Sequence, residues 1–246
     1  MQGQARQEGL RVRATGLPAE KRHSPFRVPG HIVVSGLLVS GIASSVLWVA
    51  TDILASLLYD GYSYTAQTIS ELSAIDAPSR PYVGPAILVY DLLLIAFAFG
   101  IWQASGGNRA LRVVAGLTVV HALVDLVLGP FSSMHQREVL AAGGATRSDT
   151  LHLVVAGSYA ITIFLMAGFG AVAFGKGFRL YSIATILTLL VFGILTAMEA
   201  PKVQDNESTP WIGVTERINA YAAMLWIAVL AVYLLRGSLP APRGRR

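Results

Sequence analysis

Long apolar segments separated by short polar stretches fill the chain after residue 30. The apolar segments are His31–Leu58, Tyr82–Trp102, Leu111–Phe131, Leu151–Phe174, Leu180–Ala200 and Ile218–Leu235. Each approaches or exceeds the roughly 20 residues that a helix needs to cross about 30 Å of hydrocarbon. A helix satisfies its own backbone hydrogen bonds in lipid, whereas the short alternating strands of a membrane barrel do not occur in the sequence. The pattern therefore predicts an all-α membrane protein, a bundle of six transmembrane helices.

The composition agrees with a membrane protein. Hydrophobic residues make up 54% of the 246 residues and charged residues only 13%, whereas a soluble domain usually carries about 25% charged residues. The chain has no cysteine. Disulfides, thiolate metal sites and cysteine nucleophiles are therefore excluded.

The polar ends of the chain predict two tails around one membrane domain. Residues 1–30 are basic and carry several prolines, which predicts a disordered cytoplasmic tail. Residues 31–236 form the predicted six-helix transmembrane domain, and residues 237–246 form a second basic cytoplasmic tail. The first apolar segment is far longer than the core of a signal peptide, so we expect no cleavage.

The distribution of Lys and Arg predicts the orientation. If both chain ends lie inside, most of the 19 Lys and Arg residues fall in the two tails and in the turns 104–110 and 175–179. This agrees with the positive-inside rule and predicts a multi-pass protein of the plasma (cytoplasmic) membrane. The same distribution explains the net charge of +5 without nucleic-acid binding. The longer outer loops, 59–81, 132–149 and 201–216, are then the expected place for specific features.

Ionisable residues within the apolar segments are the best functional clue, because charges inside a bilayer are costly. The candidate polar cluster comprises Asp52, Asp91, His121, Asp125, His152, Glu71 and Arg217. The helical candidates fall in the outer half of the bundle or near its middle. His121 and Asp125 are four residues apart and share a helix face. Asp91 lies near the middle and needs a partner, Arg217 or His121, unless its carboxyl group is neutral.

Structural roles compete with functional ones at several of these positions. Asp149 is a natural N-cap for the fourth apolar helix, and Thr215 with Glu216 can cap the last one. The stretch Thr68-Ile69-Ser70-Glu71 fits a capping box, which predicts a short helix in the first outer loop and a structural Glu71. His121 and Asp125 can equally form a polar clamp between helices.

Motifs of soluble enzymes are missing from the sequence, which has no Gly-rich phosphate loop, HExxH helix or GxSxG elbow. No cofactor is predicted. A zinc ion would need three or four good ligands, and His121, Asp125 and His152 are the candidate set.

Several stretches on the predicted outer side carry a family resemblance. They are Thr68-Ile69-Ser70-Glu71-Leu72-Ser73-Ala74 with Pro78, Gly129-Pro130-Phe131 with His135, Asp149-Thr150-Leu151-His152, and Glu216-Arg217-Ile218. Over roughly residues 30–236 the chain resembles the domain of unknown function 998 family of six-helix integral membrane proteins. A distant relation to Frag1 and DRAM-type membrane proteins is a further comparison. The resemblance implies fold and membrane location, and it implies no activity.

Three functional hypotheses follow, and the sequence leaves open whether the protein is an enzyme. The first is a membrane protein with a polar site in its outer half that binds a lipid or a partner. The second is a transporter of small molecules or ions that uses the intramembrane carboxylates. The third is a metal-dependent membrane hydrolase acting on lipid. Membrane lipids are the expected partners, together with a second copy of the chain or another membrane protein.

Overall fold

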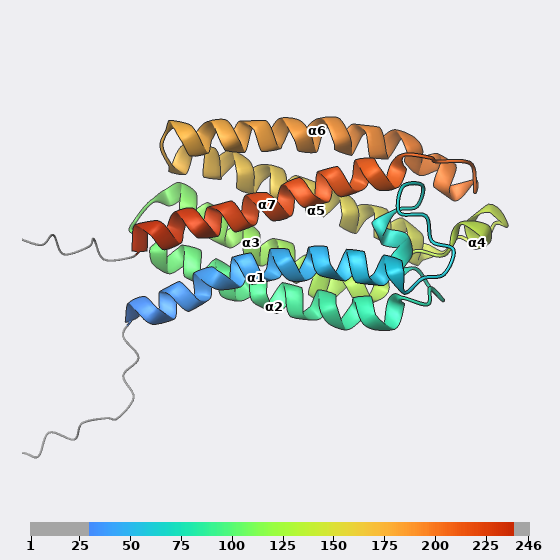
Figure 1. The fold of residues 1–246 in the computed structure, drawn as a ribbon, viewed down its shortest axis with the longest axis horizontal. Helices are drawn as coiled ribbons and strands as arrows, with labels where there is room; N and C mark the ends of the chain where they lie inside the picture. The colour runs from blue at the N-terminus through green and yellow to red at the C-terminus, as the bar shows by residue number, and fades with distance from the viewer. Residues whose placement is uncertain (1–29, 239–246) are drawn as a thin grey trace, which may run out of the picture.

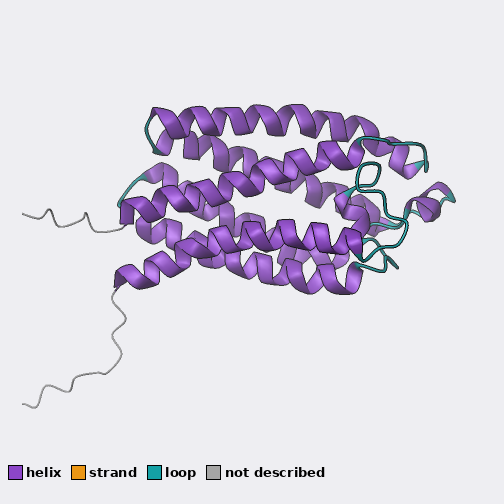
Figure 2. Ribbon diagram, in the orientation of Figure 1, coloured by secondary structure: helices purple, strands orange, loops and turns teal. Residues whose placement is uncertain are grey.

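The computed structural model describes residues 30–238, and this part of the chain is helical with connecting loops and no strand (Figures 1 and 2). The long helices are α1 (Gly30–Leu57), α2 (Arg80–Ala104), α3 (Arg109–Leu128), α5 (Arg147–Ala173), α6 (Lys176–Gln204) and α7 (Ile212–Ser238). The short ones are η1 (Ile69–Ser73), η2 (Gly129–Phe131) and α4 (Arg137–Ala141). The two predicted tails lie outside the described residues, apart from Gly30 and the last turn of α7.

The long helices confirm the predicted fold class. Within residues 30–238, six helices are long and apolar enough to cross a membrane. Large apolar side chains such as Val46, Leu180 and Met198 are exposed on them. A soluble protein would bury side chains of this kind, whereas acyl chains of a bilayer accommodate them. The chain is therefore a multi-pass membrane protein.

Several helices begin earlier than their apolar segments, because the residues before those segments are helical too. Helix α5 begins at Arg147, and Thr146 is its N-cap, so the prediction of Asp149 as the cap is wrong. Asp149 instead stands third in the helix and completes a capping box with Thr146. Helix α7 begins at Ile212. Thr215 and Glu216 therefore lie inside the helix and do not cap it.

The long helices form a ring. Following the contacts, α1 packs on α2, α2 on α3, α3 on α5, α5 on α6, α6 on α7, and α7 returns to α1. In Figure 1 both described chain ends lie at the left of this bundle, while η1 and α4 lie at the right. We call these the terminal end and the loop end. The loop end carries the segments 58–79, 132–146 and 205–211.

Large side chains fill the ring near the terminal end. Leu38, Phe97, Phe178, Trp226 and Leu230 are at most 1% exposed and belong to one apolar cluster. Two glycines make room for the rings. A Cβ at Gly41 would lie 2.7 Å from Phe97, and one at Gly170 would lie 2.5 Å from Trp226. This packed layer closes the interior on the terminal side, and we call it the plug.

The loop end is organised by short elements. Thr68 caps η1, and Thr68 and Glu71 form the reciprocal hydrogen bonds of a capping box, which confirms the prediction for this stretch. A small apolar cluster that includes Ala74, Met134 and Ile212 packs the loops against the start of α7. The loops therefore form a fixed cap on the ring and not a set of loose connections.

Candidate functional site

The interior of the ring contains a cavity in the half nearer the loop end. Its volume is about 1240 Å³, and residues of every long helix line it. Ligand pockets usually measure about 300–1,000 Å³, so the space is large enough for a sizeable molecule. Met166, Met224 and Ile227 belong both to the cavity lining and to the apolar cluster of the plug. The plug is therefore the floor of the cavity.

The predicted site residues lie at or beside this cavity. Those that line it are Asp52, Asp91, His121, Asp125 and His152. Glu71 and Arg217 do not line it and lie in networks of the loop end. The helix ring thus brings together residues that are far apart in the sequence, although their binding role stays a prediction.

Asp91 stands out because its side chain has no hydrogen-bond partner in the part of the chain that the structure describes. It lies near the middle of α2 and is 1% exposed. Neither carboxylate oxygen has a hydrogen-bond partner among residues 30–238. Neither Arg217 nor His121 therefore serves as the partner that the sequence suggested. A second acid lies in its surroundings, because the carboxyl groups of Asp91 and Asp125 interact electrostatically.

Asp125 and His121 share a face of α3, as their spacing predicted, but they bind different groups. The Tyr159 hydroxyl donates a hydrogen bond to the Asp125 carboxylate. His121 Nδ1 lies 2.7 Å from Thr162 Oγ1, and the His121 ring lies 5.0 Å from the Tyr159 ring. Helices α3 and α5 are therefore joined by polar contacts at the depth of the cavity. Sequence reasoning missed Tyr159, whose only signal is a polar ring inside an apolar segment.

The remaining histidines are held by loop groups. His152 Nδ1 donates to the backbone oxygen of Ser132 over 3.0 Å. Asp149 accepts hydrogen bonds from the backbone nitrogen and from Nδ1 of His135, at 2.7 and 2.9 Å. In the part of the chain that the structure describes, no three His, Asp or Glu side chains form a group that could hold a metal ion. The zinc set His121, Asp125 and His152 stays a prediction without support from this geometry.

Asp52 and Arg217 form a buried ion pair between α1 and α7. Arg217 Nε and an Nη atom lie 3.0 and 2.9 Å from the two Asp52 carboxylate oxygens, and both residues are 3% exposed. Tyr221 donates to Asp52 over 2.6 Å. The Arg217 guanidinium lies 3.6 Å from the centre of the Tyr64 ring and donates to the Tyr64 backbone oxygen. The pair therefore ties the first outer loop to both helices.

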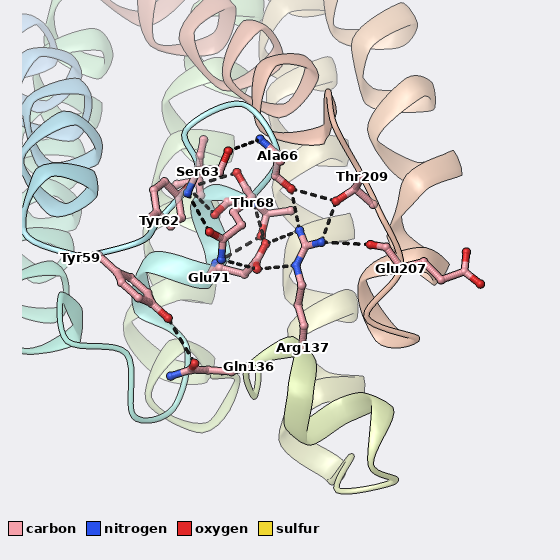
Figure 3. Close-up of polar contacts among 12 residues, drawn as sticks. Tyr59, Tyr62, Ser63, Ala66, Thr68, Glu71, Gln136, Arg137, Glu207 and Thr209 are labelled. Carbon is pink, nitrogen blue, oxygen red and sulfur yellow. Dashed lines mark hydrogen bonds and ion pairs between the residues drawn. The ribbon is translucent and has the colours of Figure 1, made fainter.

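A second buried ion pair holds the loops together (Figure 3). Arg137 of α4 donates to both Glu71 carboxylate oxygens, over 2.6 and 2.8 Å. It also donates to Thr209 Oγ1 over 2.7 Å and to the Ala66 backbone oxygen over 2.9 Å. Sequence reasoning missed Arg137, because nothing local connects it with a glutamate 66 positions earlier.

The pKa of Glu71 reflects this network. Burial alone would raise the pKa, but hydrogen bonds from Arg137, the Thr68 backbone and Gln67 outweigh burial and lower it below the ordinary value of 4.5. Glu71 is therefore a charged structural residue of the loop end. Its position in a capping box was the one sequence signal for that role.

The stretches that carried the family resemblance meet in space. Glu216 of α7 accepts a hydrogen bond from the Ile69 backbone nitrogen over 2.6 Å, which joins the start of η1 to the last helix. Arg217 follows directly and holds the loop before η1. The loop end is thus one polar assembly built from separate sequence stretches.

Fold and site together define a multi-pass membrane protein whose ring of helices encloses a cavity lined by ionisable groups. The model of a protein family of unknown function (DUF998) matches residues 42–233, and the chain belongs to that family. No curated protein and no solved structure matches the chain. The matched region covers the cavity, the polar assembly of the loop end and the named plug residues except Leu38.

Proposed function

We propose that this protein resides in the plasma membrane and binds a lipid, or a similar amphipathic molecule, in the cavity of the ring. The observation that carries the proposal is the cavity itself, about 1240 Å³ in volume and lined by residues of every long helix. Leu, Ile and Met side chains provide apolar walls for a hydrocarbon chain. Asp91, Asp125 and His121 provide a polar region for a head group.

The two ends of the cavity differ, and this difference favours binding of a ligand over its transport across the membrane. The plug residues Phe97, Phe178 and Trp226 are at most 1% exposed and fill the ring beneath the cavity. Hydroxyl groups at that depth bond to helix backbone, as Thr118 does to the Val114 oxygen. A transport route would need a continuous polar path. No contact within residues 30–238 specifically favours the transporter or the hydrolase hypothesis.

The charge distribution supports an outward-facing cavity. Arg109, Arg112, Lys176 and Arg179 lie beside the turns of the terminal end, and the positive-inside rule places such turns in the cytoplasm. The loop end then faces outward, and a ligand of the outer leaflet would enter there. The resident ligand is accordingly expected to be a membrane lipid.

The test is lipid retention by a protein whose cavity has been filled. Ala197 of α6 lines the cavity, whereas Ala184 of the same helix is exposed and lies outside it. We expect lipid to copurify with the wild-type protein and to be lost from Ala197→Trp, because the indole occupies the space of the ligand. Ala184→Trp should retain it. Native mass spectrometry in a neutral maltoside detergent measures both.

A second pair of variants, on another helix, shows whether the loss of lipid comes from filling the cavity and not from a folding defect. Ala156 of α5 lines the cavity, and Val172 of α5 is 63% exposed and does not. Ala156→Trp and Val172→Trp should repeat the contrast, with monodisperse elution as the criterion of folding. Equal lipid retention by all folded variants would show that the cavity is not the binding site.

A further inference from the structure

The carboxylate of Asp91 indicates the chemistry of a ligand that the cavity would bind. Its side chain is 1% exposed and lines the cavity, yet its oxygens have no partner in the described chain. Buried carboxylates in folded proteins are almost always paired or hydrogen-bonded, because burial without a partner is costly. A ligand that brings a hydrogen-bond donor or a positive charge would supply the partner that residues 30–238 do not.

A second carboxylate strengthens this requirement. Asp125 of α3 interacts electrostatically with Asp91, and it accepts a hydrogen bond from Tyr159. Like charges at close range disfavour each other, and a positive charge between them stabilises both. The pair therefore favours a cation more strongly than either residue would alone.

The described part of the chain offers this pair no cation of its own. Among the cavity-lining residues of segment 30–238, Arg80 is the single Lys or Arg. It opens α2, about 16 Å along the helix from Asp91 at 1.5 Å per residue. The buried guanidinium of Arg217 is committed to Asp52. His121 Nδ1 is occupied by Thr162.

Aromatic rings next to the carboxylates indicate that the cation is an ammonium group. Tyr90 and Tyr159 line the cavity, and the His121 ring packs 5.0 Å from Tyr159. The face of a tyrosine ring attracts ammonium groups, including quaternary ones. Asp91, Asp125 and the described residues around them form no metal-holding group. The apolar remainder of the cavity suits a hydrocarbon chain attached to the cation.

We propose that the cavity binds amphiphiles whose head carries an ammonium group, with the ammonium between Asp91 and Asp125 and the chain along the apolar walls. This inference deepens the proposed function and rests on it. An ammonium head occurs both in membrane aminolipids and in soluble long-chain amines, and the tests below separate these two sources.

The first experiment compares three decyl amphiphiles that differ in head charge. The purified full chain in a neutral maltoside detergent is titrated with decyltrimethylammonium, decanol and decanoate, and binding is followed by tryptophan fluorescence. Decyltrimethylammonium should bind at least about tenfold more tightly than decanol, as charge-assisted contacts predict. Decanoate should bind most weakly. Partition into the micelle is the same for every variant, so differences between variants report the site.

Matched variants assign the preference to the carboxylates. Asp91→Asn and Asp125→Asn each keep the side-chain size and remove the charge, and each should reduce the preference for the ammonium by about tenfold or more. Asp60→Asn is the control, because Asp60 is exposed and does not line the cavity. Retention of the full preference in both cavity variants would overturn the proposal. If one cavity variant fails to fold, the other carries the same test.

The outcomes separate this inference from the proposed function. If Ala197→Trp blocks all binding but the wild type binds decanol and decyltrimethylammonium equally, the cavity is a binding site and the ammonium proposal is wrong. If Ala197→Trp blocks no binding, the proposed function itself fails.

Native mass spectrometry identifies the source of the ligand. An aminolipid retained by wild-type protein and lost from Asp91→Asn would identify a membrane lipid. Protein that retains no lipid but binds decyltrimethylammonium through Asp91 would identify a soluble amine.

Discussion

At the scale of single residues, Asp91 combines a structural cost with a candidate role in binding. It is 1% exposed and unpartnered within the described chain. Leaving a buried polar group unpaired costs about 1–3 kcal/mol. Residues retained at such a cost commonly serve function and not stability. The ligand-free protein should therefore be more stable without this charge.

The corresponding prediction concerns thermal unfolding of lipid-depleted protein. Asp91→Asn should raise the unfolding midpoint by about 2–4 °C, the shift expected for each kcal/mol in a chain of this size. Asp60→Asn should leave the midpoint unchanged. Differential scanning fluorimetry in maltoside detergent measures both. A clear drop for Asp91→Asn would mean that Asp91 supports the fold through contacts of its own.

For the Asp52–Arg217 pair we expect the opposite effect, a loss of stability when one of the two residues is replaced. Both residues are 3% exposed, so removing one leaves a buried charge unpaired. Arg217→Leu should lower the free energy of unfolding by about 3–5 kcal/mol. The double variant with Asp52→Asn should cost less than the sum of the two single changes, because it removes both charges. Unfolding in denaturing detergent measures the free energies of unfolding of the wild type, the two single variants and the double variant. Strictly additive effects would show that the two residues do not interact.

The sequence identified most of these residues but not their partners. The high cost of intramembrane charge pointed to Asp52, Asp91 and Asp125 without any structure. It could not assign Arg217 to Asp52, because that pairing depends on α7 closing the ring against α1. Ring order is a tertiary property, and the periodicity of an apolar helix does not encode it.

At the scale of elements, the loop end depends on η1 and α4 being joined. Glu71 and Arg137 link them over 2.6 Å, and Arg137 continues to Thr209 before α7. These contacts hold the loops in place as a cap over the cavity. Local sequence rules found the capping box of η1, because its residues are neighbours. They could not find α4 or its arginine contact, which joins separate loops.

The pKa of Glu71 gives this contact a pH dependence. The pKa is lowered in the folded protein relative to its ordinary value of 4.5. The unfolded chain therefore binds the proton more readily, and the contribution of Glu71 to stability is present above pH 4.5 and lost as the pH falls through the lower folded pKa. Glu71→Gln should thus lower the unfolding midpoint at neutral pH.

The difference between wild type and Glu71→Gln should shrink as the pH falls below about 4.5. Thermal scans over a pH series measure it. Glu207→Gln is the control, because the Glu207 side chain is exposed, and it should change little at any pH. A difference that stays constant with pH would mean that the charge of Glu71 does not stabilise the loop end.

The positions at which the helices begin could not be predicted from hydropathy. Hydropathy located every long helix, but α5 and α7 begin at Arg147 and Ile212, before the apolar segments. The first turn of α5 is polar and is satisfied by capping contacts, whereas the first turn of α7 packs Ile212 into the apolar cluster of the loops. Thr146 is the actual cap of α5, and Asp149 completes its capping box. Membrane helices extend beyond the hydrocarbon layer. The hydropathy of a segment locates the part of the helix inside this layer but not the turns outside it.

At the scale of the whole molecule, the fold followed from composition and segment length, whereas the cavity did not. Apolar segments of sufficient length fixed the helical class. The plug and the cavity depend on which side chains meet inside the ring, such as Trp226 against Gly170. Most positions of each long helix are apolar, so the sequence does not reveal which faces point inward. The hollow half of the ring is thus a property of the assembled protein.

The orientation of the whole molecule determines which compartment supplies the ligand. The chain has no native cysteine, so single cysteines can report on each end separately. Ala142 follows α4 at the loop end, and Gly175 lies in the turn before α6 at the terminal end; both are exposed. The positive-inside rule predicts that Ala142→Cys reacts with a membrane-impermeant maleimide in intact cells. Gly175→Cys should react only after the membrane is permeabilised.

This pair of labelling results decides between two directions of ligand entry. The expected pattern places the cavity toward the outer leaflet, because the cavity lies in the loop half of the ring above the plug. Total labelling in permeabilised cells controls for expression and reactivity of each cysteine. The reverse pattern would place the loop end in the cytoplasm. The ammonium amphiphile would then have to come from the inner leaflet or the cytoplasm, and the outward-facing part of the proposed function would be wrong.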